Sequence, residues 1–498
     1  MITKYEQYVA EMQKIADVNY SIGLLQWDKE VKMPTKGAAI RSQQISTLSG
    51  IVHELSTSDA LGDLLETLFE NKDSLSEKQA KNVVLSREKF LKKKKYTIEF
   101  VKHRSRVVAN AYHQWIAARK ANDYGVFKEA LREIVKISRE ETKILGYEGH
   151  PYNALVDQYE KGMKVNVLDE LFKDVRQQLV DFGTKVRECE QVDNSFLHKF
   201  YEKDKQWKFG LELLKEIGYD FEAGRQDIST HPFSINFNSN DVRVTTRIDE
   251  NDFANMTWST IHEGGHALYE QGLPLESYGL PLGTNISLGI HESQSRLWEN
   301  NVGRSLSFWK PRYENVQNIF PEALKEVDLD AFYKGMNRVE ANLIRTESDE
   351  LNYHFHVLIR YEIEKGLIEG SLEVDDLDKV WNQKYKEYMG VDVPDDNQGI
   401  LQDIHWSHGS LGYFPTYSLG SFYAAQFYQQ AEKEIENLKE SIESGDTQPL
   451  LDWLRDKVHR HGRFYTAEEL CIKITGEPLN FKYFMNYAKA KYGDIYGL

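Results

Sequence analysis

Apolar residues recur at three- and four-residue spacing over long stretches of the chain. The clearest stretches run from Leu61 to Lys95 and from Tyr124 to Leu145, where charged residues separate the apolar positions, as in a surface helix. The chain has only 11 prolines, and because proline breaks helix interiors, the long proline-free stretches permit long helices. We find no internal repeat and no low-complexity linker, so the pattern predicts a mainly α-helical protein without an obvious boundary between independent domains.

One region, from Asp227 to Ile248, departs from the helical pattern. Polar and β-branched residues alternate here around a central Asn-Ser-Asn, which is typical of a β-hairpin. We predict strands at His231–Phe237 and Val242–Ile248, joined by a turn at Asn238–Asn240. An exposed edge of such a small sheet can bind a peptide backbone as an additional strand.

Composition and charge exclude several classes of protein. Hydrophobic residues make up 41% of the 498 residues and charged residues 28%, as in soluble globular proteins. The formal charge of −16 argues against nucleic-acid binding, which normally needs a basic face. The only two cysteines, Cys189 and Cys471, exclude a disulfide scaffold, and we expect both to be reduced, buried thiols. We see neither a signal peptide nor a membrane span, and we expect a cytoplasmic protein without a membrane partner.

The motif His-Glu-x-x-His supplies candidate metal chemistry at His262, Glu263 and His266. On a helix, residues i and i+4 share one face, so the two imidazoles can bind the same Zn²⁺ ion. Glu263 can act as general base on the water at the metal without being a ligand. The pattern also arises by chance, but its apolar surroundings indicate a buried helix. Gly264 and Gly265 each cost about 1 kcal/mol relative to Ala inside a helix, which indicates the close approach of a backbone or a substrate.

A catalytic zinc site needs a third protein ligand and one open position. The candidates downstream are Glu270, Glu276, His291, Glu292 and Glu299. We assign Glu292, because it lies 30 residues beyond His262, enough for the chain to return through the Gly- and Pro-rich loop between Gly272 and Gly289 into a second predicted helix. Glu299 lies two turns later on the same face, where it either orients a zinc-bound histidine or is an exposed helix charge.

Several further motifs stand in order along the chain. They are HEGGHALYEQG followed by HESQSRLWEN, Asp241-Val-Arg243-Val-Thr245, Ile344-Arg345-Thr-Glu-Ser348-Asp349-Glu350-Leu351, Gly399-Ile-Leu-Gln402-Asp403-Ile-His405-Trp406, and the N-terminal Trp27-Asp28 and Met33-Pro34. Together these segments resemble the thermostable carboxypeptidase (carboxypeptidase Taq) family of metallopeptidases, and the resemblance covers most of the chain. One small departure is Ser348, where alanine is common in the family.

The resemblance implies a mainly α-helical fold with a deep groove between two halves, like neurolysin and angiotensin-converting enzyme, and a small sheet beside the zinc site. Residues 1–498 would form a single peptidase unit with two lobes, with the catalytic motifs between residues 227 and 425. The resemblance also implies His262, His266 and Glu292 as ligands of one Zn²⁺ ion per chain, with Glu263 as general base. Family members release amino acids from free C-termini of peptides with broad specificity, poorly around proline. They often tolerate Co²⁺, and they are commonly homodimers.

A carboxypeptidase must recognise a C-terminal carboxylate, and a planar guanidinium suits that task. Arg345 is the first candidate, although it can instead pair with Asp349 on the same predicted helix. Arg243 is the second, and its position in Asp-x-Arg-x-Thr also suggests a structural pair within the hairpin. The further candidates for substrate contact are His231, Gln402, Asp403 and His405.

An oxyanion forms during peptide hydrolysis, and a Tyr hydroxyl or a protonated His can stabilise it. The His-, Gly- and Tyr-rich segment from His408 to Gly420 offers His408 and Tyr413, with Tyr417 behind them. The alternative is that these residues belong to an aromatic core. His354 and His356 point to different faces of a predicted helix, and we exclude them as a metal pair.

Two other functions stay open beside the metallocarboxypeptidase. An oligoendopeptidase can use the same zinc site, and a catalytically inactive protein can use zinc for stability and binding alone. Glu263 argues against the inactive protein, because a purely structural site has no use for a base at that position.

Overall fold

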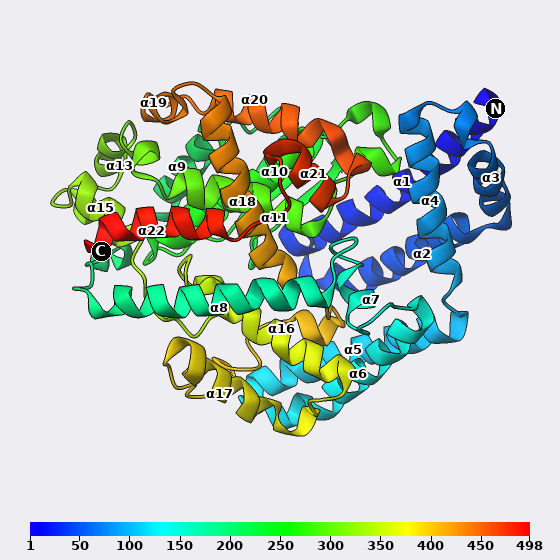
Figure 1. Ribbon diagram of the computed structural model, residues 1–498, viewed down its shortest axis with the longest axis horizontal. Helices are drawn as coiled ribbons and strands as arrows, with labels where there is room; N and C mark the ends of the chain where they lie inside the picture. The colour runs from blue at the N-terminus through cyan, green and yellow to red at the C-terminus, as the bar shows by residue number, and fades with distance from the viewer. The chain divides into compact units, whose positions relative to one another are not determined.

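The computed structural model describes residues 1–498. The chain divides into two compact units, each assembled from three separated segments. Unit 1 contains residues 1–94, 193–336 and 424–478, and unit 2 contains residues 95–192, 337–423 and 479–498. Helices dominate the chain, which has only three strands (Figure 1). The mainly α prediction is therefore confirmed, whereas the single peptidase unit with a groove between two lobes stays a prediction.

The bounds of the elements are as follows. The helices of unit 1 are α1 (Ile2–Val31), α2 (Ala38–Thr57), α3 (Asp59–Glu70), α4 (Glu77–Lys94), α9 (Lys203–Glu216), α10 (Phe253–Gln271), α11 (Leu288–Arg296), α12 (Leu306–Trp309), α13 (Tyr313–Ile319), α14 (Pro321–Leu324), α15 (Leu329–Met336), α19 (Leu438–Glu443), α20 (Gln448–Lys457) and α21 (Ala467–Thr475). Those of unit 2 are α5 (Ile98–Ala121), α6 (Tyr124–Leu145), α7 (Asn153–Val156), α8 (Val165–Glu188), α16 (Tyr353–Glu369), α17 (Leu377–Met389) and α22 (Lys482–Tyr496), while α18 (Pro415–Glu434) contributes residues to both units. The strands, all in unit 1, are β1 (Gly224–Ile228), β2 (Ser234–Asn238) and β3 (Asp241–Thr246). None of the helices combines the length and the apolar character needed to cross a bilayer.

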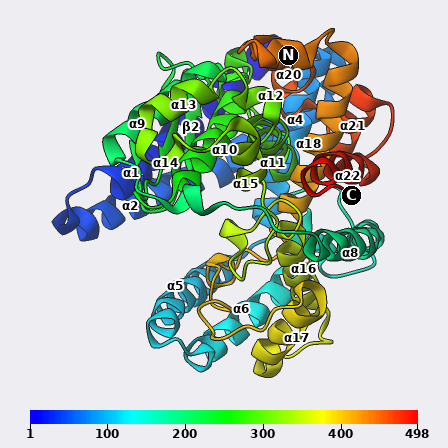
Figure 2. The same ribbon diagram turned by 90° about the vertical axis from the view of Figure 1, so that its left-hand side faces the viewer.

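Helix α6 shows how local sequence sets the helix ends and the buried face. The Asp123 side chain caps its N-terminus by accepting a hydrogen bond from the Gly125 amide at 2.8 Å, and Gly146, with a φ of 79°, ends it. Apolar residues such as Leu131 and Ile134 lie on its buried face, and α6 packs alongside α5 (Figure 2). This helix has the bounds that the spacing of apolar residues predicts.

The structure refines one expectation and corrects another. The stretch from Leu61 to Lys95 is helical over most of its length, as its periodicity predicts, but the polar turn Lys72–Ser74 divides it into α3 and α4. Asn and Ser side chains in that turn hydrogen-bond the nearby backbone and so compete with the helix. Cys471 is buried as expected, but Cys189, at the end of α8, is only half-buried; both cysteines are free thiols.

The predicted hairpin is present as β2 and β3, which pair antiparallel with a bulge between Asn236 and Asn238. A third strand, β1, was not predicted; it pairs in parallel with β3, so β3 is the central strand. β1 lacks an apolar alternation, because its buried residues are the polar Gln226 and Asp227. The sheet packs on α10, where the Thr246 and Ser259 hydroxyls lie 2.9 Å apart.

Helices α10 and α11 approach each other at Gly265. A Cβ atom at this position would lie 2.7 Å from both the Gln294 carbonyl oxygen and the Ser295 Cα atom, which belong to α11. Two backbones can come this close only where no side chain intervenes. The sequence allowed two explanations for the mid-helix glycine, the close approach of a backbone or of a substrate. At Gly265 it is the backbone of α11 that comes close.

We predict that Gly265→Ala destabilises the protein by about 1–3 kcal/mol, because the added methyl group overpacks this contact. Gly50→Ala is the matched control. Gly50 also lies inside a helix, but a Cβ atom there meets nothing within 4 Å, so alanine should stabilise the protein by about 0.5–1 kcal/mol. The unfolding midpoints of both variants and the wild type give the measurement. Equal midpoints for the two variants would contradict the close approach.

Candidate metal centre

Helix α10 presents His262 and His266 on one face. Asp252 fixes the start of the helix by accepting hydrogen bonds from the Ala254 and Asn255 amides at 2.9 and 3.3 Å. The two imidazole rings lie 4.9 Å apart and nearly perpendicular, at 87°. This helix therefore holds two nitrogen donors close together in unit 1.

Glu292 on α11 completes the cluster. Its Oε2 atom lies 3.7 Å from His262 Nε2 and 3.4 Å from His266 Nε2. In the group His262, His266 and Glu292, all ligand atoms lie within 4.8 Å of one another. Tetrahedral Zn²⁺ with bonds near 2.1 Å separates its ligand atoms by about 3.4 Å. Two imidazole nitrogens and one carboxylate oxygen at these distances fit a zinc ion and leave a fourth position for water or substrate.

Glu299 lies directly behind His262. The π-helical segment Leu297–Gly303 follows α11 and places Glu299 Oε2 2.8 Å from His262 Nδ1. A carboxylate there fixes the Nδ1–H tautomer, which leaves Nε2 free to bind a metal. Glu299 also pairs with Arg296 at 3.2 Å and Arg304 at 3.3 Å, so it is not an exposed helix charge.

Burial and neighbouring charges shift the pKa values of all three residues. Burial and then the neighbouring His291 lower the pKa of His266 to about 3, which keeps this ring neutral. Burial opposes protonation of His262, but Glu292 and Glu299 outweigh it and raise the pKa of His262. Burial alone would raise the pKa of Glu292, but Arg296 and the two histidines hold it well below its usual range. Glu292 is therefore a charged carboxylate facing two imidazole nitrogens.

Glu263 follows His262 on α10 and is buried, with 8% of its surface exposed. Burial raises its pKa to about 7, although the adjacent His262 lowers it. A carboxylate with a pKa near neutrality can both accept and return a proton, as a general base requires. The other acidic and histidine candidates for the third ligand, Glu270, Glu276 and His291, lie outside the cluster of three.

Unit 2 carries a buried ion-pair cluster around Asp403. Arg345 binds Asp403 Oδ1 through Nε at 3.1 Å and Nη2 at 2.9 Å, and its Nη1 donates to the Tyr353 hydroxyl. Arg360 binds the other oxygen, Oδ2, at 2.6 Å. The expected alternative partner of Arg345 was Asp349, and this is wrong: Arg345 lies in the 3-10 turn Arg345–Glu347 and not one helical turn before Asp349.

The Gln402 side chain binds the backbone that carries Arg345. Its Oε1 atom accepts from the Arg345 amide at 2.9 Å, and its amide nitrogen donates to the Leu343 carbonyl at 3.0 Å. His405 Nε2 lies 3.0 Å from the Tyr417 hydroxyl, and its ring lies 5.3 Å from the Tyr413 ring. Gln402, Asp403, His405, Tyr413 and Tyr417 are thus neighbours in unit 2.

The remaining candidates are more isolated. His408 is an exposed residue whose ring lies 5.3 Å from the Tyr112 ring. Desolvation of the imidazole by its neighbours lowers the pKa of His408, which disfavours the protonated form. His231 is exposed before β2. Arg243 forms the expected pair within the hairpin, with both Asp241 oxygens at 2.8 and 2.9 Å, and its guanidinium lies 4.5 Å from the Trp27 ring.

His354 and His356 have separate hydrogen-bond partners. Both side chains are fully buried on α16, but His354 Nδ1 contacts the Ser418 hydroxyl at 2.9 Å and His356 Nδ1 contacts the Tyr385 hydroxyl at 2.8 Å. The two rings therefore serve different partners on different faces of the helix.

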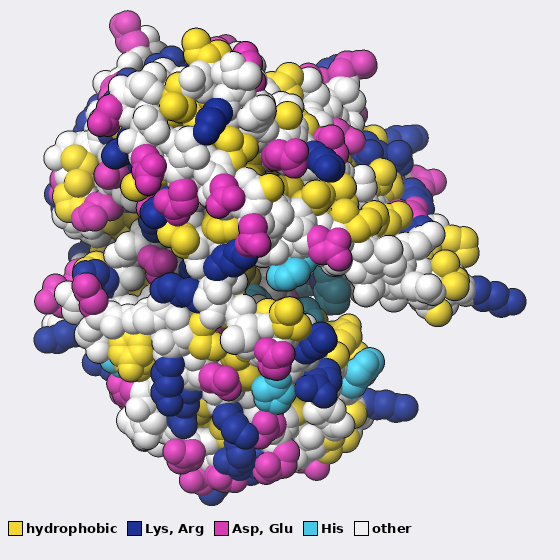
Figure 3. Space-filling model, turned by 90° about the vertical axis from the view of Figure 1, so that its right-hand side faces the viewer, with side chains coloured by type: hydrophobic (Ala, Val, Ile, Leu, Met, Phe, Trp, Pro, Cys, Tyr) yellow, Lys and Arg dark blue, Asp and Glu magenta, His cyan; other side chains and the backbone are white.

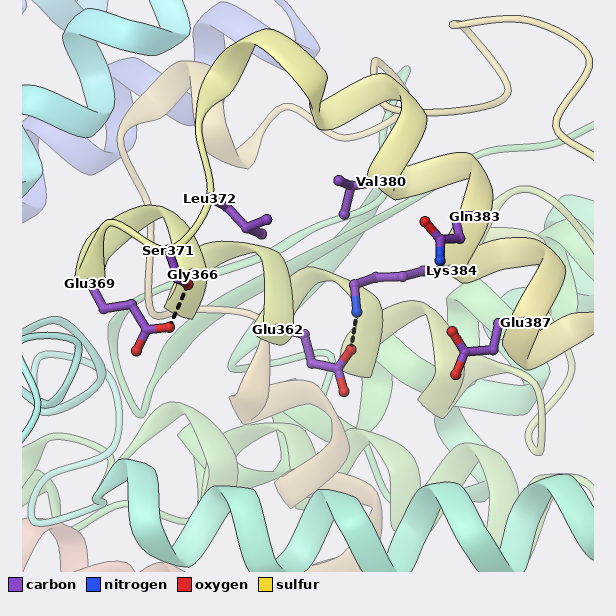
Figure 4. A pocket seen from close by; sticks show the side chains of 9 residues that line it. All are labelled: Glu362, Gly366, Glu369, Ser371, Leu372, Val380, Gln383, Lys384 and Glu387. Carbon is purple, nitrogen blue, oxygen red and sulfur yellow. Dashed lines mark hydrogen bonds and ion pairs between the residues drawn. The ribbon is translucent and has the colours of Figure 1, made fainter.

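A cavity of about 280 Å³ lies between α16 and α17 (Figure 4). Glu362, Glu369 and Glu387 line it together with Lys384, which pairs with Glu362. None of the predicted site residues lines this cavity. Charged side chains of both signs are interspersed over the face of the molecule drawn in Figure 3.

Comparison with known proteins shows the family of the chain. Residues 4–492 match the carboxypeptidase Taq (M32) metallopeptidase family. The chain belongs to this family. It is 37% identical to carboxypeptidase 1 of Bacillus subtilis and 38% identical to thermostable carboxypeptidase 1 of Thermus thermophilus, each over 99% of both chains. The crystal structure of the M32 carboxypeptidase from Deinococcus radiodurans R1 superposes with a TM-score of 0.97 at 37% identity and full coverage of both chains. The M32 family is one of metallopeptidases, which are peptide hydrolases.

We predict that Asp403→Asn destabilises the protein by about 3–5 kcal/mol, because it leaves two buried guanidinium groups without their counter-charge. Burial alone would raise the pKa of Asp403, but Arg345 and Arg360 hold it well below its usual range, so this carboxylate is charged in the folded protein. Asp392→Asn is the control, since Asp392 pairs with Lys386 at the exposed surface and should cost at most about 1 kcal/mol. Denaturant unfolding compares the two; equal losses would contradict a buried charge cluster.

Proposed function

We propose that this protein is a zinc-dependent carboxypeptidase that releases amino acids from the free C-termini of peptides. The convergence of His262, His266 and Glu292 within 4.8 Å is the observation that carries the proposal. Membership of the M32 metallopeptidase family supports it, and so do full-length relatives that are named carboxypeptidases. An oligoendopeptidase or an inactive zinc protein is less well supported.

His262 Nε2, His266 Nε2 and one Glu292 oxygen would hold the ion. Zn²⁺ bound there supplies Lewis-acid chemistry, because it polarises a carbonyl group and makes a water molecule more acidic. Glu263 takes the proton from the attacking water and then gives it to the leaving amine. Glu299 keeps the proton of His262 on Nδ1, opposite the metal side.

We further propose that residues of unit 2 and of the hairpin contact the substrate. Tyr413 or His408 would donate a hydrogen bond to the oxyanion, and Arg345 or Arg243 would receive the terminal carboxylate. Each arginine already binds an aspartate, Asp403 or Asp241, so a substrate carboxylate has to compete with that aspartate for the guanidinium. The other proposed contacts are His231, Gln402, Asp403, His405 and Tyr417.

The finer properties are proposals that rest on the family resemblance. We propose zinc as the native metal, one ion per chain, with Co²⁺ as a working substitute, and broad specificity with slow release around proline. We also propose a cytoplasmic homodimer. Metal analysis of the purified protein tests whether zinc is the native metal. The mass of the protein in solution tests whether it is a dimer.

We predict that Glu263→Gln retains zinc but lowers kcat/KM by about 10²–10⁴-fold, because the variant lacks a proton acceptor and keeps the ligand set. Hydrolysis of an N-blocked dipeptide and metal analysis of the same sample give the measurement. Wild-type protein stripped of metal by a chelator is the control, and it should regain activity when zinc returns. Unchanged turnover in the variant would overturn the role of Glu263.

Amidation of the substrate C-terminus separates exopeptidase from endopeptidase action. A carboxypeptidase should lose activity on the amidated peptide by at least the roughly tenfold that one charge-assisted hydrogen bond contributes. An oligoendopeptidase should cleave both peptides alike. Mass spectrometry of the products distinguishes shortening from the end from internal cuts, and internal fragments as the main product would refute the proposal.

A further inference from the structure

A second histidine stands behind the metal ligand His266. His291 Nδ1 lies 2.6 Å from His266 Nδ1, and the two rings are 4.5 Å apart. The other nitrogen of His291, Nε2, lies 2.8 Å from Glu270 Oε1. Glu270, His291 and His266 thus form a continuous chain of short polar contacts that ends at Nδ1 of His266, across the ring from Nε2, the nitrogen that faces Glu292.

Only one proton fits between the two Nδ1 atoms. If His266 carries it, Nδ1 donates to His291 and Nε2 is a free lone pair that faces Glu292, 3.4 Å away. If His291 carries it, a neutral His266 has its proton on Nε2, which blocks metal binding. The position of one proton in this contact therefore decides whether His266 can be a ligand.

Glu270 decides where that proton lies. Its carboxylate offers only acceptors, so a neutral His291 must place its proton on Nε2, and His291 Nδ1 then becomes an acceptor. Glu270 is buried, with 4% exposed. Asn236 and Asn285 donate to its two oxygens at 2.6 and 3.1 Å, which holds it in place. The backbone carbonyl of His291 also lies 3.1 Å from His266 Nδ1 and favours the same tautomer.

We propose that Glu270 and His291 are positioning residues that set the tautomer of His266 and thereby the zinc affinity of the site. The inference rests on the proposed zinc site and adds two residues to it. Neither is a ligand. Glu270 belongs to α10 and His291 to α11, so the relay also joins the two helices that carry the ligands.

The two histidine ligands are therefore supported differently. His262 meets a carboxylate directly, at Glu299, and two arginines pair with that carboxylate. On its Nδ1 side, His266 meets a carboxylate only through the ring of His291. Through its two nitrogens, the His291 ring couples the tautomer of His266 to the Glu270 carboxylate. The ring also separates the charge of Glu270 from the metal site.

The test is a double-mutant cycle on zinc affinity, with Glu270→Gln, His291→Phe and the double variant. Phenylalanine keeps the aromatic packing on Tyr269, whose ring lies 5.4 Å away, but it cannot accept or pass on a hydrogen bond. We expect each single variant to weaken zinc binding about 10–100-fold. If Glu270 acts through His291, the double variant should bind zinc no more weakly than His291→Phe alone.

Competition with a chromophoric zinc chelator gives the dissociation constants. Glu276→Gln is the matched control, because Glu276 is exposed in the loop after α10 and its neutralisation should leave zinc affinity unchanged. Multiplicative losses in the double variant would overturn the relay, as would unchanged affinity in the single variants. Failure of the wild-type protein to bind zinc would refute the proposed function instead, so the two failures are distinguishable.

A second measurement determines which histidine nitrogens carry protons, and it does not require Glu270→Gln to fold. In zinc-loaded wild-type protein with ¹⁵N-labelled histidine, the relay requires His266 to be protonated at Nδ1 and His291 at Nε2 only. The difference spectrum with His291→Phe identifies the His291 signals. A proton on His291 Nδ1 in the zinc-loaded protein would overturn the proposal even if Glu270→Gln does not fold.

Discussion

The contact between the backbones of α10 and α11 is the constraint on which the candidate site depends. Two histidines on one helix cannot hold a catalytic metal alone, and the third ligand must come from a second helix at a fixed distance. At Gly265 the backbones meet with no side chain between them, and this places Glu292 within 3.7 Å of both imidazoles. The position of the third ligand follows from this approach.

Buried charges near the site occur in compensated groups. Glu292 and Glu299 would repel each other without a cation, and Arg296 contacts both, while Arg304 pairs with Glu299. A zinc ion would add two further positive charges. The Asp403 cluster in unit 2 shows the same principle with the signs reversed, because one carboxylate serves two buried guanidinium groups. Charge placement of this kind is costly to disturb, since removing one partner leaves the other unpaired and away from water.

Sequence reasoning was reliable where chemistry and spacing act locally. The i, i+4 spacing put His262 and His266 on one face, the alternation of residues predicted the hairpin, and the apolar periodicity predicted α6. It was less reliable where the partner lies far along the chain. Strand β1 has no apolar alternation, because it buries polar side chains. Asp349 was the alternative partner that the sequence suggested for Arg345, whereas the fold supplies Asp403.

The sequence by itself determined the chemistry available to this protein: two imidazoles and a base on one helix, a choice of downstream carboxylates, and a mainly helical fold. These depend on residue types and on periodicities of a few residues, which one sequence displays in full. Only the tertiary structure decided which carboxylate meets the histidines, which one stands behind His262, and that Glu270 reaches His266 through His291. Such choices depend on distances between segments far apart in the chain, and those distances are set by the packing of the whole unit.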